Sequence, residues 1–312
     1  MVQYFSIEDK KSIAINNPEK ATWVNVLPPL KEEEFYELSK DLFIPIDFLK
    51  DSLDIDERSR FETEEKVKLI VIKTPTENNS FNESDAFYIT IPICIIITNG
   101  QIVTVNSFEN EAIKKFLNSF QHNPPEEKNL MALKIFEKII TNFPDYLKEI
   151  NQRRNLLEPK LYVANRNEDL FQLMRIQKSL VYFITALRSN ELLMMKLART
   201  NFLQLEPDEK DFLDDLVIEN SQALETANTY TNILSSTLDA YASIISNNQN
   251  LVLKRLATLT ILLSIPVLIA SIYGMNVPLP YQDSHFAFWI PTAVSLLILA
   301  YAIYNFVKQY KR

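Results

Sequence analysis

The stretch LATLTILLSIPVLIASIYGMN, residues 256–276, decides how the rest of the chain must be organised. Its first 17 residues, Leu256 to Ile272, contain no charged side chain, and neither do the 22 residues from Phe286 to Val307. About 20 apolar helical residues cross the hydrocarbon core of a bilayer, so both segments are predicted membrane spans. Two buried helices of a soluble domain are the alternative, which the closeness of the two segments disfavours.

Basic residues flank the two spans on one side only. The connector from residue 273 to residue 285 has no lysine or arginine. The positive-inside rule therefore places both termini in the cytoplasm and makes the protein a multi-pass protein of the cell membrane. The N-terminus has no basic region followed by an apolar core, so no signal peptide is expected. The flanking basic residues are Lys254, Arg255, Lys308, Lys311 and Arg312.

The composition excludes several classes of site. There are two glycines, whereas average usage would give about 22, so the glycine-rich phosphate loops of nucleotide enzymes are absent. One cysteine and two histidines cannot supply a Cys/His zinc site or an intrachain disulfide. Cys94 lies in an isoleucine-rich segment and is predicted to be buried. No nucleophile–base pair is apparent, so an enzyme is the least expected class.

Charge is distributed unevenly along the chain. The first 250 residues carry a net charge of -12, and the remainder carries +4. An acidic body repels nucleic acid and attracts cations. We therefore expect no nucleic-acid partner and infer no protein partner other than the chain itself.

Residues 1–125 are predicted to form a cytosolic α/β domain. Segments rich in β-branched residues favour strands, and Asn99-Gly100 between the last two is a hairpin signal. The predicted strands are Thr22–Val26, Val67–Lys73, Ala86–Thr98 and Gln101–Val105, and the predicted short helices are Lys31–Asp41 and Pro45–Leu53.

Everything after this domain is predicted to be helical. Residues 126–205 form helices packed on the domain, with Pro144 and Pro159 marking kinks or ends. The remaining segments are a stalk helix (206–255), a first span (256–273), an extracellular loop (274–285), a second span (286–307) and a basic cytosolic tail (308–312).

The stalk and the first span are predicted to be one continuous helix. Glu206-Pro207-Asp208 is a helix start, and no proline or glycine follows until Pro266. A helix of about 65 residues is about 100 Å long, so it must connect the body to the bilayer.

One face of this helix, the seam, is small or polar where a coiled coil would carry leucine. Steps of four and three residues give Asp239, Ser243, Ser246, Asn250, Leu253, Ala257, Thr260, Ser264, Val267 and Ser271. Small residues can simply allow close helix packing. Alternatively, several copies of the helix surround an aqueous pore, with Leu253 and Leu256 as its apolar constriction. The pore requires an oligomer.

The first span ends in Tyr273-Gly274-Met275-Asn276, and Gly274 is expected to supply the positive φ that ends a helix abruptly. This motif, between two C-terminal spans, resembles the signature of the CorA family of magnesium and cobalt channels. Asp239-x-Tyr241-x-Ser243 upstream resembles the stalk of that family, and the segments around Trp23 and Arg58 resemble its N-terminal domain.

The resemblance implies an α+β/α membrane protein that assembles as a funnel-shaped homopentamer and takes up Mg²⁺, and Co²⁺, passively. Gly274, Met275 and Asn276 would form the selectivity filter, with a ring of neutral amides facing the ion. Mg²⁺ sheds water reluctantly, so such a ring suits outer-sphere contact with the hydrated ion.

Divalent ions bound between cytosolic domains regulate members of this family. The resemblance places the stalk-side acid at Asp215, and Asp211 is a further candidate. Its partner would come from the α/β domain of the neighbouring subunit, where Glu83 and Asp85 are the candidates. Alternatively, the two stalk acids bind no metal and lie near the start of the helix only because the helix dipole favours negative charge there. Asp283 is the one acid of the outer loop.

Two other functions stay open. The first is that the protein is a CorA-like transporter of Zn²⁺ or mainly Co²⁺, although Met275 favours magnesium within the family. A non-conducting, membrane-anchored sensor or interaction protein is the other, and it has no need of the polar seam.

Overall fold

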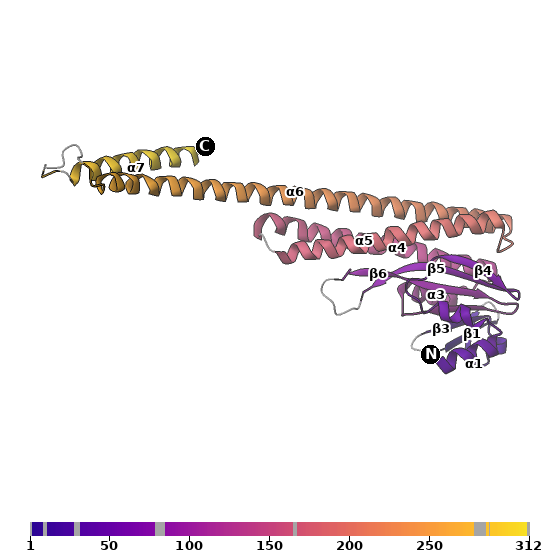
Figure 1. Cartoon of the computed structure of the whole chain (residues 1–312). Helices are drawn as coiled ribbons and strands as arrows, with labels where there is room; N and C mark the ends of the chain where they lie inside the picture. The colour runs from indigo at the N-terminus through magenta and orange to yellow at the C-terminus, as the bar shows by residue number, and fades with distance from the viewer. Residues whose placement is uncertain are drawn as a thin grey trace. The chain divides into compact units, whose positions relative to one another are not determined.

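A computed structural model describes residues 2–8, 11–27, 32–78, 85–164, 167–277, 285–286 and 288–310. The chain divides into two compact units, Met1–Thr237 and Leu238–Arg312. Helix α6 (Pro207–Tyr273) begins in the first unit and ends in the second (Figure 1). The single long helix predicted from the sequence is therefore confirmed, with its start one residue after Glu206.

The first unit contains a seven-stranded mixed sheet. Strands β3 and β7 are parallel, and every other neighbouring pair is antiparallel. The sequence predicted β3, β5, β6 and β7, but not β1, β2 or β4. In spatial order the strands are β2 (Lys11–Ile15), β1 (Val2–Glu8), β3 (Trp23–Val26), β7 (Ile102–Asn106), β6 (Tyr88–Ile97), β5 (Val67–Glu77) and β4 (Arg60–Glu64).

The short helices lie between the strands, and the long helices follow them. Helix α4 continues through Pro144 and Pro159, so of the two predicted outcomes, a kink or an end, the end is wrong at both prolines. Phe143 and Leu147 are buried beside Pro144, and this packing supports the helix despite the missing N–H. The helices are η1 (Pro18–Lys20), α1 (Glu32–Leu42), α2 (Ile46–Asp51), α3 (Glu111–His122), α4 (Lys128–Ala164), α5 (Asn167–Thr200) and α7 (Trp289–Tyr310).

Both faces of the sheet are covered, which explains its uninterrupted apolar strands. On one face, Val24 and Cys94 join a core cluster with Phe48 of α2. On the other face, the Trp23 ring packs edge-on against Phe116 of α3, with ring centroids 4.9 Å apart. Cys94 is fully buried, as predicted, and burial raises the pKa of its thiol.

The first part of α6 packs on the helices of this unit through one face. Leu213, Leu216 and Ala223 are buried on that face. The buried Asn220 amide donates a hydrogen bond of 2.9 Å from Nδ2 to the carbonyl oxygen of Leu187 in α5. Apolar contacts and one specific polar contact therefore fix the rotation of α6 about its own axis within this unit.

The second unit consists of the rest of α6 together with α7. Both helices are long and apolar enough to cross a membrane. Their apolar side chains are largely exposed, with Ile261 64%, Leu268 63% and Leu297 71% accessible. These segments are therefore not the buried core helices of a soluble domain within this chain.

Candidate functional site

The seam of α6 is exposed along the second unit. All ten seam residues, from Asp239 to Ser271, are accessible, including Leu253 at 62% and Val267 at 67%. The predicted constriction residue Leu256 is 54% exposed. Polar side chains are unfavourable against lipid, so in a membrane this exposed stripe must face either another protein surface or water.

The opposite face of α6 is the covered one. Leu262 is 8% exposed, and Thr258, Ile265, Pro266 and Ile269 are partly covered at the same helical spacing. Helix α7 has a matching covered face, which consists of Pro291, Thr292, Ser295, Leu299, Ala302 and Phe306. Because α7 belongs to the same compact unit, we infer that these two faces cover each other.

The seam points away from this packed face. Leu262 and Ser264 are about 200° apart around a helix of 3.6 residues per turn. The side of α6 that remains open in the second unit is therefore the side on which the small and polar residues lie.

The seam hydroxyl groups are oriented by the helix itself. Thr260 Oγ1 donates to the Leu256 carbonyl oxygen at 2.9 Å, and Ser264 Oγ donates to the Ile261 carbonyl oxygen at 2.8 Å. Because each hydroxyl hydrogen is used inside the helix, the oxygen lone pairs remain available as acceptors. Acceptors of this kind suit the water molecules bound around a cation, which donate hydrogen bonds outward.

The helix end at Gly274 differs from the expectation. No glycine among the described residues has a positive φ, so the expected left-handed turn is wrong. The Gly274 N–H donates to the carbonyl oxygens of Ala270 and Ser271, at 3.0 and 3.2 Å, which continues the helical pattern. An added Cβ would lie 3.4 Å from Ala270 O, an ordinary contact, so nothing in the part of the chain that the structure describes requires glycine there.

The outer end of the candidate site is open. Met275 is 55% exposed and Asn276 is also exposed, directly after the end of α6. Asp283, the predicted outer-loop acid, lies outside the described residues. The accessible amide of Asn276 offers a neutral oxygen acceptor at this end of the seam.

The predicted regulatory acids are placed on two separate parts of the first unit. Asp211 and Asp215 are exposed, one turn apart on the face of α6 opposite Leu213 and Leu216. Asp85 is partly exposed near the start of β6, and its carbonyl oxygen accepts from Arg175 Nε at 2.6 Å. Glu83 lies outside the described residues.

No three histidine, cysteine, aspartate or glutamate residues gather into a metal-binding group in the part of the chain that the structure describes. One chain therefore does not bring Asp85 together with the two stalk acids. The prediction placed these groups on neighbouring subunits, so each chain would contribute one half to each of two sites.

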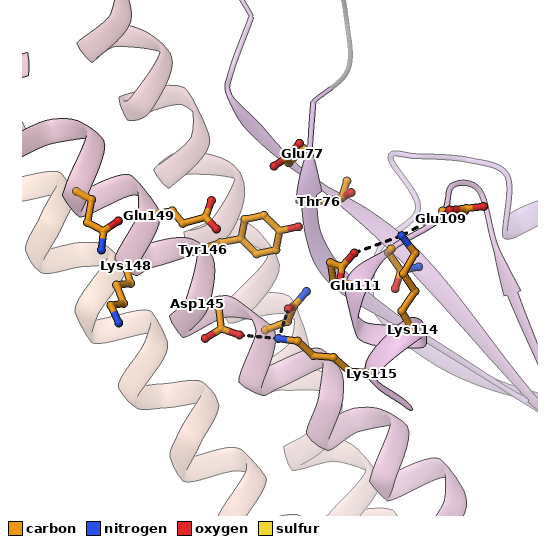
Figure 2. Close-up of a pocket in the computed structure, with 13 residues that line it drawn as sticks. Thr76, Glu77, Glu109, Glu111, Lys114, Lys115, Asp145, Tyr146, Lys148 and Glu149 are labelled. Atoms are coloured by element: carbon orange, nitrogen blue, oxygen red, sulfur yellow. Dashed lines mark hydrogen bonds and ion pairs between the residues drawn. The ribbon is translucent and has the colours of Figure 1, made fainter. Parts of the chain in front are cut away.

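A polar pocket of about 690 Å³ in the first unit was not predicted. Figure 2 shows its walls, from the end of β5, the start of α3 and the middle of α4. Lys115 contacts Asp145 at 2.6 Å, and Lys114 contacts Glu111 at 3.3 Å and Glu109 at 3.6 Å. These lysines are already paired with carboxylates, so they offer no free positive charge to a ligand.

Tyr146 lies in the middle of this pocket. Burial raises the pKa of its hydroxyl group, and Glu77, Glu111 and Glu149 raise it further. The sequence offers no local signal for such a pocket, because its residues come from three segments far apart in the chain. The polar seam, and not this pocket, therefore remains the candidate functional site.

Comparison with known proteins identifies the family. A family model described as CorA-like Mg2+ transporter protein matches residues 18–311. The chain belongs to this family. Among CorA proteins it is 27% identical to the cobalt/magnesium transport protein CorA of Methanocaldococcus jannaschii, over 91% of this chain and 89% of that protein.

Other members of the CorA family agree with this assignment. The cobalt/magnesium transport protein CorA of Thermotoga maritima is 20% identical over 82% of this chain and 73% of its own length. The complete structure of the CorA magnesium transporter from M. jannaschii matches with a TM-score of 0.85 at 24% identity, covering 98% of this chain and 97% of that one. The fold is therefore that of a full-length CorA protein, with an α/β domain, a long helix and a C-terminal helix.

Proposed function

We propose that this protein conducts Mg²⁺, and Co²⁺, passively into the cell as a homopentamer whose α6 helices line the pore. One observation carries the proposal. The mostly small or polar seam of α6 is exposed and faces away from the side that α7 covers. Symmetry-related copies of α6 could surround water with this face, while α7 lies outside them in the lipid. The ions are those of the cobalt/magnesium transport proteins to which this chain is similar.

Gly274, Met275 and Asn276 are the proposed selectivity filter. A ring of Asn276 amide oxygens would accept hydrogen bonds from the water shell of the entering ion. Neutral acceptors hold a hydrated divalent ion more weakly than carboxylates would, so the ion can also leave. The acceptor oxygens of Thr260 and Ser264 would continue this outer-sphere path along the seam.

The proposed topology follows the segments predicted from the sequence. Residues 1–255 and the tail 308–312 are cytoplasmic, residues 256–273 and 286–307 span the cell membrane, and residues 274–285 form the outer loop. The basic residues at the inner ends of both spans support this orientation.

Regulation is proposed to reside between cytosolic domains. Asp211 and Asp215 of one subunit would bind a divalent ion together with Glu83 and Asp85 of the next. An ion that binds the closed state more tightly shifts the population toward that state. Rising internal Mg²⁺ would thus close its own entry route.

The decisive experiment is Mg²⁺ and Co²⁺ uptake into proteoliposomes by the wild type and by Asn276→Ala. We expect uptake by the wild type and its loss in the variant. Asn247→Ala, an exposed asparagine of α6 off the seam, is the matched control and should retain uptake. No flux of either ion from a correctly assembled wild-type oligomer would contradict the proposal.

A further inference from the structure

Helix α7 has an exposed stripe of its own. Leu297 and Tyr301 are each 71% accessible, Tyr304 is 63% accessible, and Lys308 is also exposed. The steps of four, three and four residues place these side chains on one face of the helix. We call these four residues the outer stripe.

The outer stripe faces away from α6. The covered face of α7 is centred on Ser295, Leu299 and Ala302. Tyr304 is about 180° from Ser295 around the helix, and Lys308 is about 220° from it. The stripe is therefore the part of α7 farthest from its own partner helix.

Polarity changes in order along the outer stripe. Leu297 is purely apolar, the two tyrosines add hydroxyl groups to apolar rings, and Lys308 ends the series with a cation. The series covers about 16 Å at 1.5 Å per residue. This order matches the passage from acyl chains through the glycerol region to the phosphates of a bilayer leaflet, where tyrosine and lysine are favoured.

The depth of Lys308 agrees with this passage. Lys308 is 19 residues after Trp289, the first residue of α7. Lys254 is also 19 residues before the end of its helix, because α6 ends at Tyr273. That distance is about 28 Å, close to the thickness of a hydrocarbon core of about 30 Å. Both lysines thus lie at the same membrane boundary, on the side opposite to Trp289.

We propose that Tyr304 and Lys308 bind the headgroup of an anionic phospholipid in the cytoplasmic leaflet. The Lys308 ammonium contacts the lipid phosphate, the Tyr304 hydroxyl donates to an ester oxygen, and an acyl chain lies along Leu297 and the ring of Tyr301. The inference rests on the proposed membrane topology, but it does not depend on ion conduction.

Charge complementarity favours a lipid over a neighbouring copy of the spanning helices. Helix α7 contains no aspartate or glutamate, and Asp239 and Asp283 are the only acids after residue 237. A spanning segment of a second copy would therefore offer no carboxylate to Lys308. Free phosphate could pair with the lysine, but it would leave the rings of both tyrosines without a partner.

The test measures lipid retained by the purified full-length oligomer after exchange into mixed phosphatidylglycerol and phosphatidylcholine nanodiscs. Native mass spectrometry would report the bound lipid, and inorganic phosphate in place of phosphatidylglycerol is the second arm. A lysine near an anionic surface contributes about 1 kcal/mol, so Lys308→Gln should weaken the phosphatidylglycerol preference about fivefold. Tyr304→Phe keeps the ring and should also weaken it, whereas Tyr301→Phe, about one turn deeper, should change it little.

Two controls separate this site from general charge attraction. Lys308→Arg should retain the preference, and Lys254→Gln, at the same depth but on α6 beside the seam, should change it little. Equal phosphatidylglycerol retention by the wild type and Lys308→Gln would overturn the proposal, as would equal competition by inorganic phosphate. Ion uptake by the same samples separates the two proposals, because lipid preference is measured without any flux.

Discussion

Asn190 shows how one buried side chain joins a helix to an open sheet edge. Its Oδ1 accepts from the Lys73 backbone N–H at 3.0 Å and from Ser59 Oγ at 2.8 Å, and its Nδ2 donates to the Lys73 carbonyl oxygen at 2.8 Å. Strand β4 pairs with β5 only as far as Val71. The amide of Asn190 thus replaces the missing strand and keeps the backbone groups of Lys73 satisfied.

Replacing this amide should destabilise the first unit. Asn190→Leu leaves the N–H and C=O of Lys73 without their partner, and unsatisfied buried groups cost about 1–3 kcal/mol each. We expect a loss of about 2–4 kcal/mol in the free energy of unfolding, measured by denaturant titration. Asn118→Leu, on the exposed side of α3, is the control and should change stability little. An unchanged midpoint for Asn190→Leu would show that water replaces the amide without cost.

At the scale of elements, α6 carries two functions on opposite faces. In the first unit its buried face includes Leu213, Leu216 and Ala223, while Asp211 and Asp215 point outward. In the second unit Leu262 is covered while Ser264 is open. A face that packs and an exposed face therefore coexist along the helix, and the proposed pore would separate support of the fold from contact with ions.

Substitution at Ser264 tests the open face. Ser264→Leu adds bulk and removes an oxygen acceptor, so uptake of Mg²⁺ into proteoliposomes should be lost. Ser264→Ala removes the oxygen alone and should reduce uptake only in part. Thr258→Val is the matched control, because Thr258 Oγ1 also donates back to its own helix, at 2.8 Å to Lys254 O, but from the covered face. Equal loss in Thr258→Val would contradict a specific role for the seam.

The elements that were predictable carry local signals. Pro207 and the acids after it predicted the start of α6, and Gly274 predicted its end. Gly274 nevertheless does not adopt the positive φ expected of it. Strand β4 was missed because its turn to β5 runs through Glu65 and Lys66, which both have positive φ without being glycine. Hairpin turns with positive φ are recognised in a sequence by glycine, asparagine or aspartate, and this turn has none of them. It is stabilised by the pairing of β4 with β5, which the sequence pattern alone does not show.

The candidate site was predictable only in part, for a related reason. The seam follows from helical spacing within one segment, so Thr260 and Ser264 could be found from the sequence. The hydroxyl hydrogen bonds that turn their lone pairs outward needed coordinates. The pocket around Tyr146 is formed by three segments that are far apart in the chain. The spacing of residues within one segment cannot predict which segments come together.

At the scale of the whole molecule, charge is separated between an acidic body and a basic membrane boundary. The first 250 residues carry -12 and the rest +4. An acidic domain concentrates cations around itself. This fits a role in which internal divalent ions are sensed as well as conducted.

The proposed regulation predicts the effect of one charge. Asp215→Asn removes a carboxylate from each proposed intersubunit site, so more internal Mg²⁺ should be needed to suppress uptake. Asp214→Asn, at the neighbouring exposed position off that face, is the control and should leave the dependence unchanged. Uptake at varied internal Mg²⁺ measures both. An identical dependence in Asp215→Asn and the wild type would remove this residue from the site.

The proposed topology can be tested with cysteine labelling. Cys94 is the single native cysteine, it is fully buried, and burial raises the pKa of its thiol, so the wild type should not react with a maleimide. In intact cells, His285→Cys should react with a membrane-impermeant maleimide. Glu64→Cys on β4 should react only after lysis. Labelling of Glu64→Cys in intact cells would reverse the orientation.

The composition of α6 also has a mechanical consequence. From Pro207 to Tyr273 it contains no glycine and, after its first residue, a single proline at 266. Proline has no backbone N–H, so the carbonyl oxygen of Leu262 lacks its usual hydrogen-bond donor at Pro266. No other residue after Pro207 in this helix removes a backbone hydrogen bond in this way. The helix therefore acts as a stiff rod with a single compliant joint, and that joint falls inside the apolar segment. Any bend in α6 is therefore expected at Pro266 and not elsewhere along the helix.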